Sequence, residues 1–390
     1  MTETLMTGTR RTQTRSTVPG ELRTSTRILM GPGPSAVHPR VLRALSTPLV
    51  GHLDPEFVAV MDDVQAMLRT LFRTDNELTF AVSAPGSAGM ETCLVNLLEP
   101  GEEAVICVHG VFGARMADVA ERCGARVTRV TAPWGEPIDP ARVEEALAGR
   151  RPKLLAVVHA ETSTGVLQPL EDLSRLARSA GALFVVDAVT SFGGTALEVD
   201  AWGIDAVYSG SQKCLSAPPG LSPVSFSPRA VAAVEARRTK VQSWFLDVTL
   251  VRGYWGGARR AYHHTAPVSQ CFALREALRI VLEEGLEARF ARHLRNHELL
   301  RDGLEALGFE LVVAPEYRLT MLNAVHLPPG LDDAAGRRRL LEEYDVEVGA
   351  GLGDFAGKVW RVGLMGESSN VNYVNVLLAA LREILGNRGK

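Results

Sequence analysis

The residue of this chain best suited to covalent chemistry is a lysine that lies among small residues. Lys213 belongs to the segment YSGSQKCLSAPPG (208–220), where its neighbours are Gly, Ser, Ala and Cys rather than carboxylates. Lysine is scarce, since only five of the 42 basic residues are lysines. Arginine keeps its proton in proteins and cannot form a Schiff base, so a lysine retained here indicates amine chemistry. A solvated loop lysine is the competing interpretation.

A second candidate is an aspartate at the end of a strongly apolar run. Asp187 closes the sequence ALFVVD (182–187). Burying a carboxylate is costly unless it is paired, and a helix cap or a structural ion pair would be the ordinary explanation. Ligand sites of open α/β sheets, however, lie at the carboxyl ends of strands. Asp187 and Lys213 would both lie at that edge.

A third candidate is the segment SAPGSAGME (83–91), which follows an apolar run and opens a helix. Small residues at a helix N-terminus leave its N–H groups accessible, and the helix dipole favours an anion there. A phosphate seat, a strand-end acid and a reactive lysine together are what pyridoxal phosphate requires. The lysine would bind its aldehyde carbon, and the acid would pair with its pyridine nitrogen.

The elements that must position these residues are indicated by seven short apolar runs separated by helical stretches. The runs are LTFAVS (78–83), AVIC (104–107), RVTRV (126–130), KLLAVV (153–158), ALFVVDAV (182–189), DAVYS (205–209) and PVSFS (223–227). Most do not alternate with polar residues, which is typical of strands buried on both faces. The pattern predicts a mostly parallel α/β sheet. A helix is also predicted from Pro55, with Asp54 as its cap.

The character of the sequence divides the chain into three parts. Residues 1–27, rich in Thr and Arg, are predicted to be a disordered or arm-like extension. Residues 28–280 are predicted to form a large cofactor-binding domain, and residues 281–390 a smaller α+β domain. A long helical region at 273–305 precedes short strand candidates at 309–314, 322–327, 345–348 and 358–363, and a final helix at 370–386.

Composition excludes several classes of protein. The chain has 390 residues, 46% hydrophobic and 22% charged, so global disorder is excluded. A formal net charge of -3 gives no basic footprint for nucleic acid, and no apolar run approaches the roughly 18 residues of a membrane span. The five cysteines are scattered without a C-x-x-C motif, which indicates a reducing compartment. We therefore expect a cytoplasmic protein without nucleic-acid or membrane partners.

From about Leu29 to the end, the chain resembles the class V, fold-type I pyridoxal phosphate aminotransferases of the serine/alanine–glyoxylate group. The segments that carry the resemblance are GPGPS (31–35), SAPGSAGME (83–91), HAETSTGVLQPL (159–170), FVVDAVTSFGG (184–194), YSGSQKCLSAPPG (208–220), YHHTAPV (262–268) and WRVGLMG (360–366). The resemblance implies an α/β fold, with a mostly parallel seven-stranded sheet in the large domain and a smaller C-terminal α+β domain.

The same segments imply roles for individual residues. Lys213 resembles the Schiff-base lysine and proton shuttle, and Asp187 resembles the partner of the pyridinium nitrogen. The other cofactor-binding positions are Pro85, Gly86 and Ser87 in the phosphate loop, Gln212 at the phosphate, Thr162 at the 3-hydroxyl side and Phe112 stacked on the ring.

Further positions imply a substrate contact and a partner subunit. Arg361 resembles the arginine that grips the α-carboxylate of the substrate through its planar fork. Tyr262 and Thr265 resemble residues that reach the cofactor phosphate of the neighbouring subunit. The resemblance therefore implies a homodimer with shared active sites.

The expected function is amino-group transfer from a serine- or alanine-type amino acid to a 2-oxo acid such as glyoxylate or pyruvate, with ping-pong kinetics through pyridoxamine phosphate. Three positions, 85, 87 and 112, depart from the family. Many relatives have Trp at position 112 and Ser-Gly-His at 85–87, whereas this chain has Phe and Pro-Gly-Ser. These departures leave open a pyridoxal phosphate lyase that eliminates a β-substituent or couples decarboxylation to deamination.

Other chemistries have weaker signals. A serine hydrolase using Ser87 would need glycine at position 85 in the G-x-S-x-G motif, and the chain has Pro85. His293 and His297 are one helical turn apart, but no third ligand is evident, so we expect no metal. Cys214 adjoins Lys213 but is predicted to lie in a structural turn rather than in the mobile loop a desulfurase needs. A cofactor-free binding protein is disfavoured because the key lysine and aspartate are present.

Overall fold

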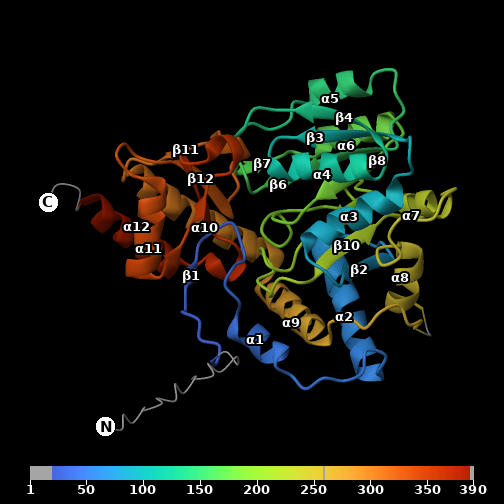
Figure 1. The fold of residues 1–390 in the computed structure, drawn as a ribbon, viewed down its shortest axis with the longest axis horizontal. Coiled ribbons are helices and arrows are strands. Elements are labelled where there is room, and N and C mark those ends of the chain that lie inside the picture. The colour runs from blue at the N-terminus through green and yellow to red at the C-terminus, as the bar shows by residue number, and fades with distance from the viewer. Residues whose placement is uncertain (1–19, 258–259, 387–390) are drawn as a thin grey trace, which may run out of the picture.

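The computed structural model describes residues 20–257 and 260–386, built around a seven-stranded sheet in the order β2-β10-β9-β8-β5-β3-β4 (Figure 1). The strands are β2 (Leu78–Val82), β3 (Glu103–Val108), β4 (Arg126–Thr131), β5 (Leu154–Val158), β8 (Leu183–Asp187), β9 (Ala206–Tyr208) and β10 (Ser222–Phe226). Strand β10 runs antiparallel to β2 and β9, and the other neighbours pair in parallel. Each strand overlaps one of the seven apolar runs, so the predicted mostly parallel sheet is confirmed.

Helices connect and cover these strands. They are α1 (Pro39–Leu45), α2 (Pro55–Phe72), α3 (Gly86–Leu97), α4 (Val111–Arg122), α5 (Pro140–Leu147), α6 (Glu171–Ser179), α7 (Pro228–Glu235), α8 (Val248–Trp255) and α9 (Val268–Glu284). A short hairpin of β6 (Ala160–Glu161) and β7 (Val166–Leu167) follows β5. Helices α3 and α4 each begin directly after a strand, so their N-termini lie near the carboxyl edge of the sheet.

Helix α2 shows how the local sequence fixes an element. Asp54 caps the helix by accepting a hydrogen bond from the backbone N–H of Glu56 at 2.8 Å, and Pro55 occupies the first turn, as predicted. Its buried apolar residues recur three or four positions apart: Phe57, Met61, Val64, Leu68 and Leu71. One face of α2 therefore packs into the main hydrophobic core, which also contains the central strands.

The C-terminal part builds a second sheet with its own core. A four-stranded antiparallel sheet has the order β11-β12-β15-β14, with β11 (Glu310–Leu311), β12 (Leu322–His326), β14 (Gly349–Ala350) and β15 (Val359–Gly363). Helices α10 (Leu286–Glu305), α11 (Asp333–Tyr344) and α12 (Val371–Gly386) pack with it, and this orange-to-red part lies to one side of the large sheet in Figure 1.

Two local features differ from the expected layout. The helical region expected over 273–305 is interrupted at Gly285, whose φ of +82° ends α9 before α10 begins. Residue 28, where we expected the large domain to begin, lies in strand β1 (Ile28–Leu29). This strand pairs in parallel with β13 (Val346–Glu347), and Met30 joins the C-terminal core. Backbone pairing between residues more than 300 positions apart leaves no local pattern from which it could be predicted. The domain limits at 28–280 and 281–390 remain a prediction.

Residues 1–19 of the expected N-terminal arm lie outside the described residues, and residues 20–27 form neither helix nor strand. None of the helices within 20–257 and 260–386 combines the length and the apolar character needed to cross a bilayer.

Candidate cofactor and substrate site

A cavity of about 280 Å³ opens where the carboxyl ends of the central strands meet the N-termini of α3 and α4. This volume is close to the lower end of the range for small-molecule sites. Eight of the residues singled out in the sequence line it: Pro85, Gly86, Ser87, Phe112, Thr162, Asp187, Gln212 and Lys213. The fold thus brings together residues that are scattered along the sequence between positions 85 and 213.

Lys213 is held inside this cavity by the loop that contains GPGPS. Its side chain is only 9% exposed, and its ammonium donates a hydrogen bond to the carbonyl oxygen of Pro32. Gly33 has a φ of +101°, and a Cβ there would lie 2.8 Å from the lysine Nζ, so only glycine fits. Burial, with the nearby positive charge of Arg361, lowers the pKa of Lys213 to about 8. A neutral amine is therefore available near physiological pH.

Asp187 is a buried carboxylate with two hydrogen-bond donors. The Tyr208 hydroxyl donates to Oδ2 at 2.8 Å, and the backbone N–H of Val189 donates to Oδ1 at 2.8 Å. Burial raises the pKa of Asp187 to about 7, although both hydrogen bonds act in the opposite direction. A cationic ring nitrogen beside this carboxylate would offset the cost of its burial.

The start of α3 is arranged to receive an anion. Its N-cap, Pro85, makes no side-chain hydrogen bond to the first turn, so the turn's N–H groups lack the usual cap. Gly86 is buried, and a Cβ there would lie 3.2 Å from a methyl group of Val189. The side-chain oxygen of Gln212, which lines the same cavity, is buried without a hydrogen-bond partner. A bound phosphate would accept hydrogen bonds from the backbone N–H groups of this first turn, and Gln212 would contact it through its amide nitrogen, because the amide oxygen accepts and does not donate.

Phe112 and Arg115 form the rim of the cavity on α4. The guanidinium carbon of Arg115 lies 5.0 Å from the centre of the Phe112 ring, and its Nη1 lies 3.4 Å from the Ser87 hydroxyl. Phe112, which we expect to stack on the cofactor ring, therefore lines the cavity, and a cation lies beside Ser87.

Arg361 reaches the site from β15 of the C-terminal sheet. Its Nε donates to the carbonyl oxygen of Ala350 at 2.7 Å, and its Nη1 donates to that of Thr162 at 3.3 Å. The side chain is 8% exposed, and burial lowers its pKa to about 10. Arg361 is not among the residues that line the cavity, but its charge acts on Lys213, so it is a neighbour of the amine.

Tyr262 and Thr265 do not line the cavity of their own chain. Both are exposed between α8 and α9, and Tyr262 is 63% exposed with its ring 5.3 Å from that of His52. An exposed position suits residues that would serve a neighbouring subunit.

Sequence reasoning missed three residues that shape the site. Tyr208, which donates to Asp187, is its direct neighbour across β8 and β9, a relation that strand register decides. Arg115 could have been predicted from the sequence, because it lies three residues after Phe112 and therefore on the same helix face. Glu161 is buried and accepts hydrogen bonds from the backbone N–H groups of Phe112 and Gly113, so it caps α4 and fixes the aromatic residue.

Other candidate residues have structural partners. The Cys214 thiol is buried and donates to the carbonyl oxygen of Thr190 at 3.2 Å, and burial raises its pKa to about 11. A thiol in this state is not poised as a nucleophile. Both ring nitrogens of His293 are engaged by backbone groups, and Nδ1 of His297 bonds to Asn323 at 2.6 Å. Over the part of the chain that is described, no group of three or more His, Cys, Asp or Glu side chains could hold a metal.

Comparison with known proteins places this geometry among aminotransferases. Residues 38–354 match the family described as Aminotransferase class-V. The chain is 38% identical to the (S)-ureidoglycine–glyoxylate transaminase of Bacillus subtilis over 94% of this chain and 92% of that protein. The structure of an alanine–glyoxylate aminotransferase from Nostoc sp. superposes with a TM-score of 0.92 at 49% identity, over 94% of this chain and 97% of that one. The pyridoxamine–pyruvate aminotransferase of Mesorhizobium loti gives a TM-score of 0.87 at 28% identity, over 93% and 92%.

Proposed function

This chain belongs to the class-V aminotransferases, and on that premise we propose that it transfers an amino group from a small amino acid to a 2-oxo acid such as glyoxylate or pyruvate. The cofactor is pyridoxal 5'-phosphate, as in the family. The observation that carries the proposal is a single cavity that holds an amine, a buried carboxylate and an uncapped helix start, with Arg361 beside it.

The side chains present fit this cofactor. The carboxylate of Asp187 would pair with the ring nitrogen, the start of α3 and Gln212 would hold the phosphate, and Phe112 would lie against the ring. When bound, the cofactor accepts the electron pair released at the substrate's Cα. Asp187 keeps the ring nitrogen protonated, which makes the ring a better electron acceptor.

Proton transfer at Cα falls to Lys213. Its pKa of about 8 lies below the ordinary 10.5, so more of the side chain is a neutral amine at neutral pH than for a solvated lysine, and only that form can accept the proton. Arg361 would bind the substrate carboxylate through its planar fork and so orient the Cα–H bond toward the amine. A guanidinium with a lowered pKa of about 10 is still fully charged at neutral pH.

The named relatives support glyoxylate or pyruvate as the amino acceptor. The Bacillus subtilis and Nostoc proteins are named for glyoxylate, and the Mesorhizobium loti protein is named for pyruvate. All three are named as amino-group transferases, so the lyase alternative left open by positions 85–87 and 112 is not favoured.

The proposal is tested by one half-reaction. The purified protein is loaded with pyridoxal phosphate and mixed with L-alanine or L-serine in the absence of any 2-oxo acid. The visible absorption of the bound cofactor should give way to that of pyridoxamine phosphate, with one 2-oxo acid released per site, and glyoxylate should restore it. Ammonia or carbon dioxide formed over many turnovers would identify a lyase instead. A protein that takes up no cofactor would contradict the proposal altogether.

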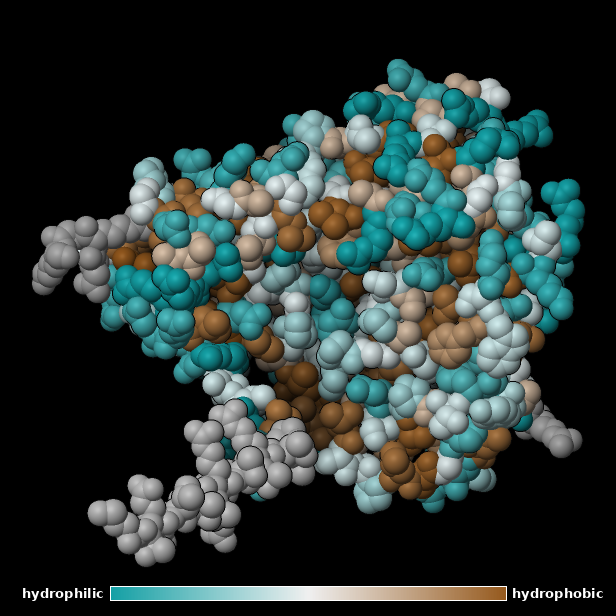
Figure 2. All heavy atoms as spheres, viewed as in Figure 1, coloured by the Kyte–Doolittle hydropathy of each residue, from teal (hydrophilic) through white to brown (hydrophobic). Residues whose placement is uncertain are grey.

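We further propose a homodimer in which Tyr262 and Thr265 complete the partner's phosphate site. Their exposure supports this, as do the apolar side chains of Leu49 and Trp244, which are 69% and 62% exposed. Apolar atoms also gather near the lower ends of α1 and α2 on the face drawn in Figure 2. Large exposed apolar groups are typical of interfaces.

Shared sites predict complementation between two inactive variants. Homodimers of Lys213→Ala and of Tyr262→Ala should each be inactive or impaired. Each mixed dimer should regain up to half the activity of a wild-type dimer, because one of its two sites has both residues intact. Mass spectrometry would first verify that mixed dimers have formed. If these dimers show no recovery of activity, the two subunits do not share their active sites.

A cytoplasmic location is also part of the proposal. All five cysteines are buried and unpaired, which suits a reducing compartment.

A further inference from the structure

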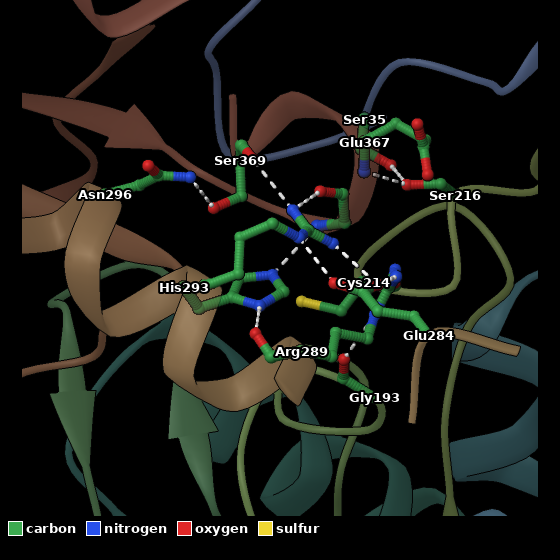
Figure 3. Close-up of polar contacts among 12 residues, drawn as sticks. Ser35, Gly193, Cys214, Ser216, Glu284, Arg289, His293, Asn296, Glu367 and Ser369 are labelled. Carbon is green, nitrogen blue, oxygen red and sulfur yellow. Dashed lines mark hydrogen bonds and ion pairs between the residues drawn. The ribbon is translucent and has the colours of Figure 1, made fainter. Parts of the chain in front are cut away.

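A partly buried charged cluster lies where α9 meets α10, outside the cavity described above. It consists of Glu284, the last residue of α9, and of Arg289 and Arg292 in the first turns of α10; we call it the Glu284 cluster. Oε1 of the glutamate accepts from Nε of Arg292 at 2.6 Å. Oε2 accepts from Nη1 of Arg289 at 2.5 Å and from Nη2 of Arg292 at 2.9 Å. Figure 3 shows Arg289 and Glu284 among backbone groups from several segments.

Arg289 binds the two loops that follow the cofactor-binding strands. Its Nη2 donates to the carbonyl oxygen of Cys214 at 2.5 Å, directly after Lys213 in the chain. Its Nε donates to the carbonyl oxygen of Gly193 at 3.0 Å, in the loop that follows Asp187. The residue is 1% exposed, so these contacts are made out of water.

Arg292 binds the segment that follows Arg361. Its Nη1 donates to the carbonyl oxygens of Gly366 at 2.9 Å and Ser369 at 2.7 Å, just beyond the end of β15. The two arginines, joined through Glu284, therefore connect the backbone beside the amine to the backbone beside the carboxylate-binding guanidinium.

Neighbouring contacts tighten the same junction. The Ser216 hydroxyl accepts from the backbone N–H of Glu367 at 2.9 Å, which ties the lysine turn to the end of β15 (Figure 3). The backbone N–H of Gly366 donates to Nε2 of His293 at 3.0 Å. Burial lowers the pKa of His293 to about 3, so the ring is neutral and accepts this bond. A Cβ at Gly366 would lie 2.7 Å from the Cys214 carbonyl oxygen, so the two segments pack without a side chain between them.

The cluster holds one carboxylate between two guanidinium groups across the working pH range. Burial alone would raise the pKa of Glu284, but the hydrogen bond and charge of Arg292 and the charge of Arg289 outweigh it and lower the pKa to about 2. The glutamate therefore stays ionised, and the two arginines make four further hydrogen bonds to backbone carbonyl oxygens. Charge-assisted hydrogen bonds fix the relative positions of the groups they join. Apolar side chains of similar volume often stabilise a fold equally well or better, so stability alone does not explain this cluster.

We propose that Arg289 and Arg292, joined by Glu284, are positioning residues that set the location of Lys213 relative to Arg361. Arg289 acts on the cofactor side and Arg292 on the substrate side. The cluster thus decides how well a substrate whose carboxylate is held by Arg361 presents its Cα to the amine. This inference rests on the proposed function, because it assigns Lys213 and Arg361 the roles given above.

The test compares single replacements in the full-length holoenzyme. Arg292→Gln should raise the KM for the amino acid about tenfold or more, with the dissociation constant for pyridoxal phosphate unchanged, since its contacts lie beside β15. Arg289→Gln should weaken pyridoxal phosphate binding about tenfold and shift the pH at which the bound cofactor changes its visible absorption, because it holds the Lys213 turn. Arg295→Gln is the matched control, since Arg295 lies exposed on the same helix.

The two variants separate positioning from simple stabilisation. A purely structural role would lower the melting temperature of both variants. The folded protein would then keep a KM and a cofactor dissociation constant within twofold of the Arg295→Gln control, and the pH midpoint of its visible absorption change would equal that of the control. That result would overturn the proposal. If Arg289→Gln does not fold, Arg292→Gln alone tests the proposal: a raised KM with unchanged cofactor affinity supports it, and an unchanged KM contradicts it. If the wild-type protein shows no half-reaction, the proposed function fails, while cofactor affinity and the pH midpoint of Arg289→Gln still test the cluster.

Discussion

Replacing Asp187 with asparagine should stabilise the cofactor-free protein at pH 8 while impairing cofactor binding. Burial raises the pKa of this carboxyl group from 3.8 to about 7, and one pKa unit corresponds to about 1.4 kcal/mol. The ionised Asp187 therefore costs the folded apoprotein about 4 kcal/mol above pH 7. Asparagine carries no charge but offers one oxygen to the two donors Tyr208 and Val189, a loss of about 1 kcal/mol. The expected net gain is about 3 kcal/mol.

The sign of the pH dependence follows from the raised pKa. Between pH 4 and pH 7, the folded protein keeps a proton on Asp187 that the unfolded chain has released. Stability from this group therefore falls as pH rises through that window and is constant above it. The advantage of Asp187→Asn should be greatest at pH 8 and vanish toward pH 4.

The assay is urea unfolding of the two apoproteins at pH 5, 6.5 and 8, with Asp205→Asn as the contrasting control. Asp205 is also buried, but it pairs with Nη1 of Arg229 at 2.8 Å and accepts from the backbone N–H of Phe184 at 2.9 Å. Its replacement should destabilise the protein. If Asp187→Asn is destabilised at pH 8 as Asp205→Asn is, the reasoning about an uncompensated buried charge is wrong.

Three further outcomes are expected. Lys213→Ala should abolish turnover yet still bind pyridoxal phosphate through the phosphate and ring contacts; wild-type turnover would contradict its role. Arg361→Lys should raise the KM for the amino acid 10- to 100-fold, because a point charge replaces the fork; an unchanged KM would remove Arg361 from substrate binding. Tyr208→Phe should raise the cofactor dissociation constant about tenfold, measured by fluorescence titration, because Asp187 loses the donor at 2.8 Å that favours its ionised form; an unchanged constant would show that the hydroxyl is dispensable.

Much of the large sheet is encoded locally. Seven short runs predict its seven strands. Strands buried on both faces must be apolar throughout, whereas the edge strand β4 is partly exposed and contains polar residues. Asp54 with Pro55 predicts the start of α2. Lys213 and Asp187 could be identified for a related reason. Asp187 ends a buried strand and Lys213 follows one in a segment of small residues, and in each place a charged residue is costly without a partner, so the sequence marks both as unusual.

Tertiary structure alone decides which distant residues meet. Nothing near Arg289 in the sequence distinguishes it from the other arginines of α10, yet it is buried against the carbonyl oxygen of Cys214, 75 residues away. The Tyr208 hydroxyl reaches Asp187 because of strand register, and β1 pairs with β13 from the opposite end of the chain. A local sequence pattern shows whether a side chain is apolar or charged, and from this it predicts whether the side chain is buried. Its partner is set by how the two sheets and the α9–α10 junction pack together, and that packing fixes Lys213 in relation to Arg361.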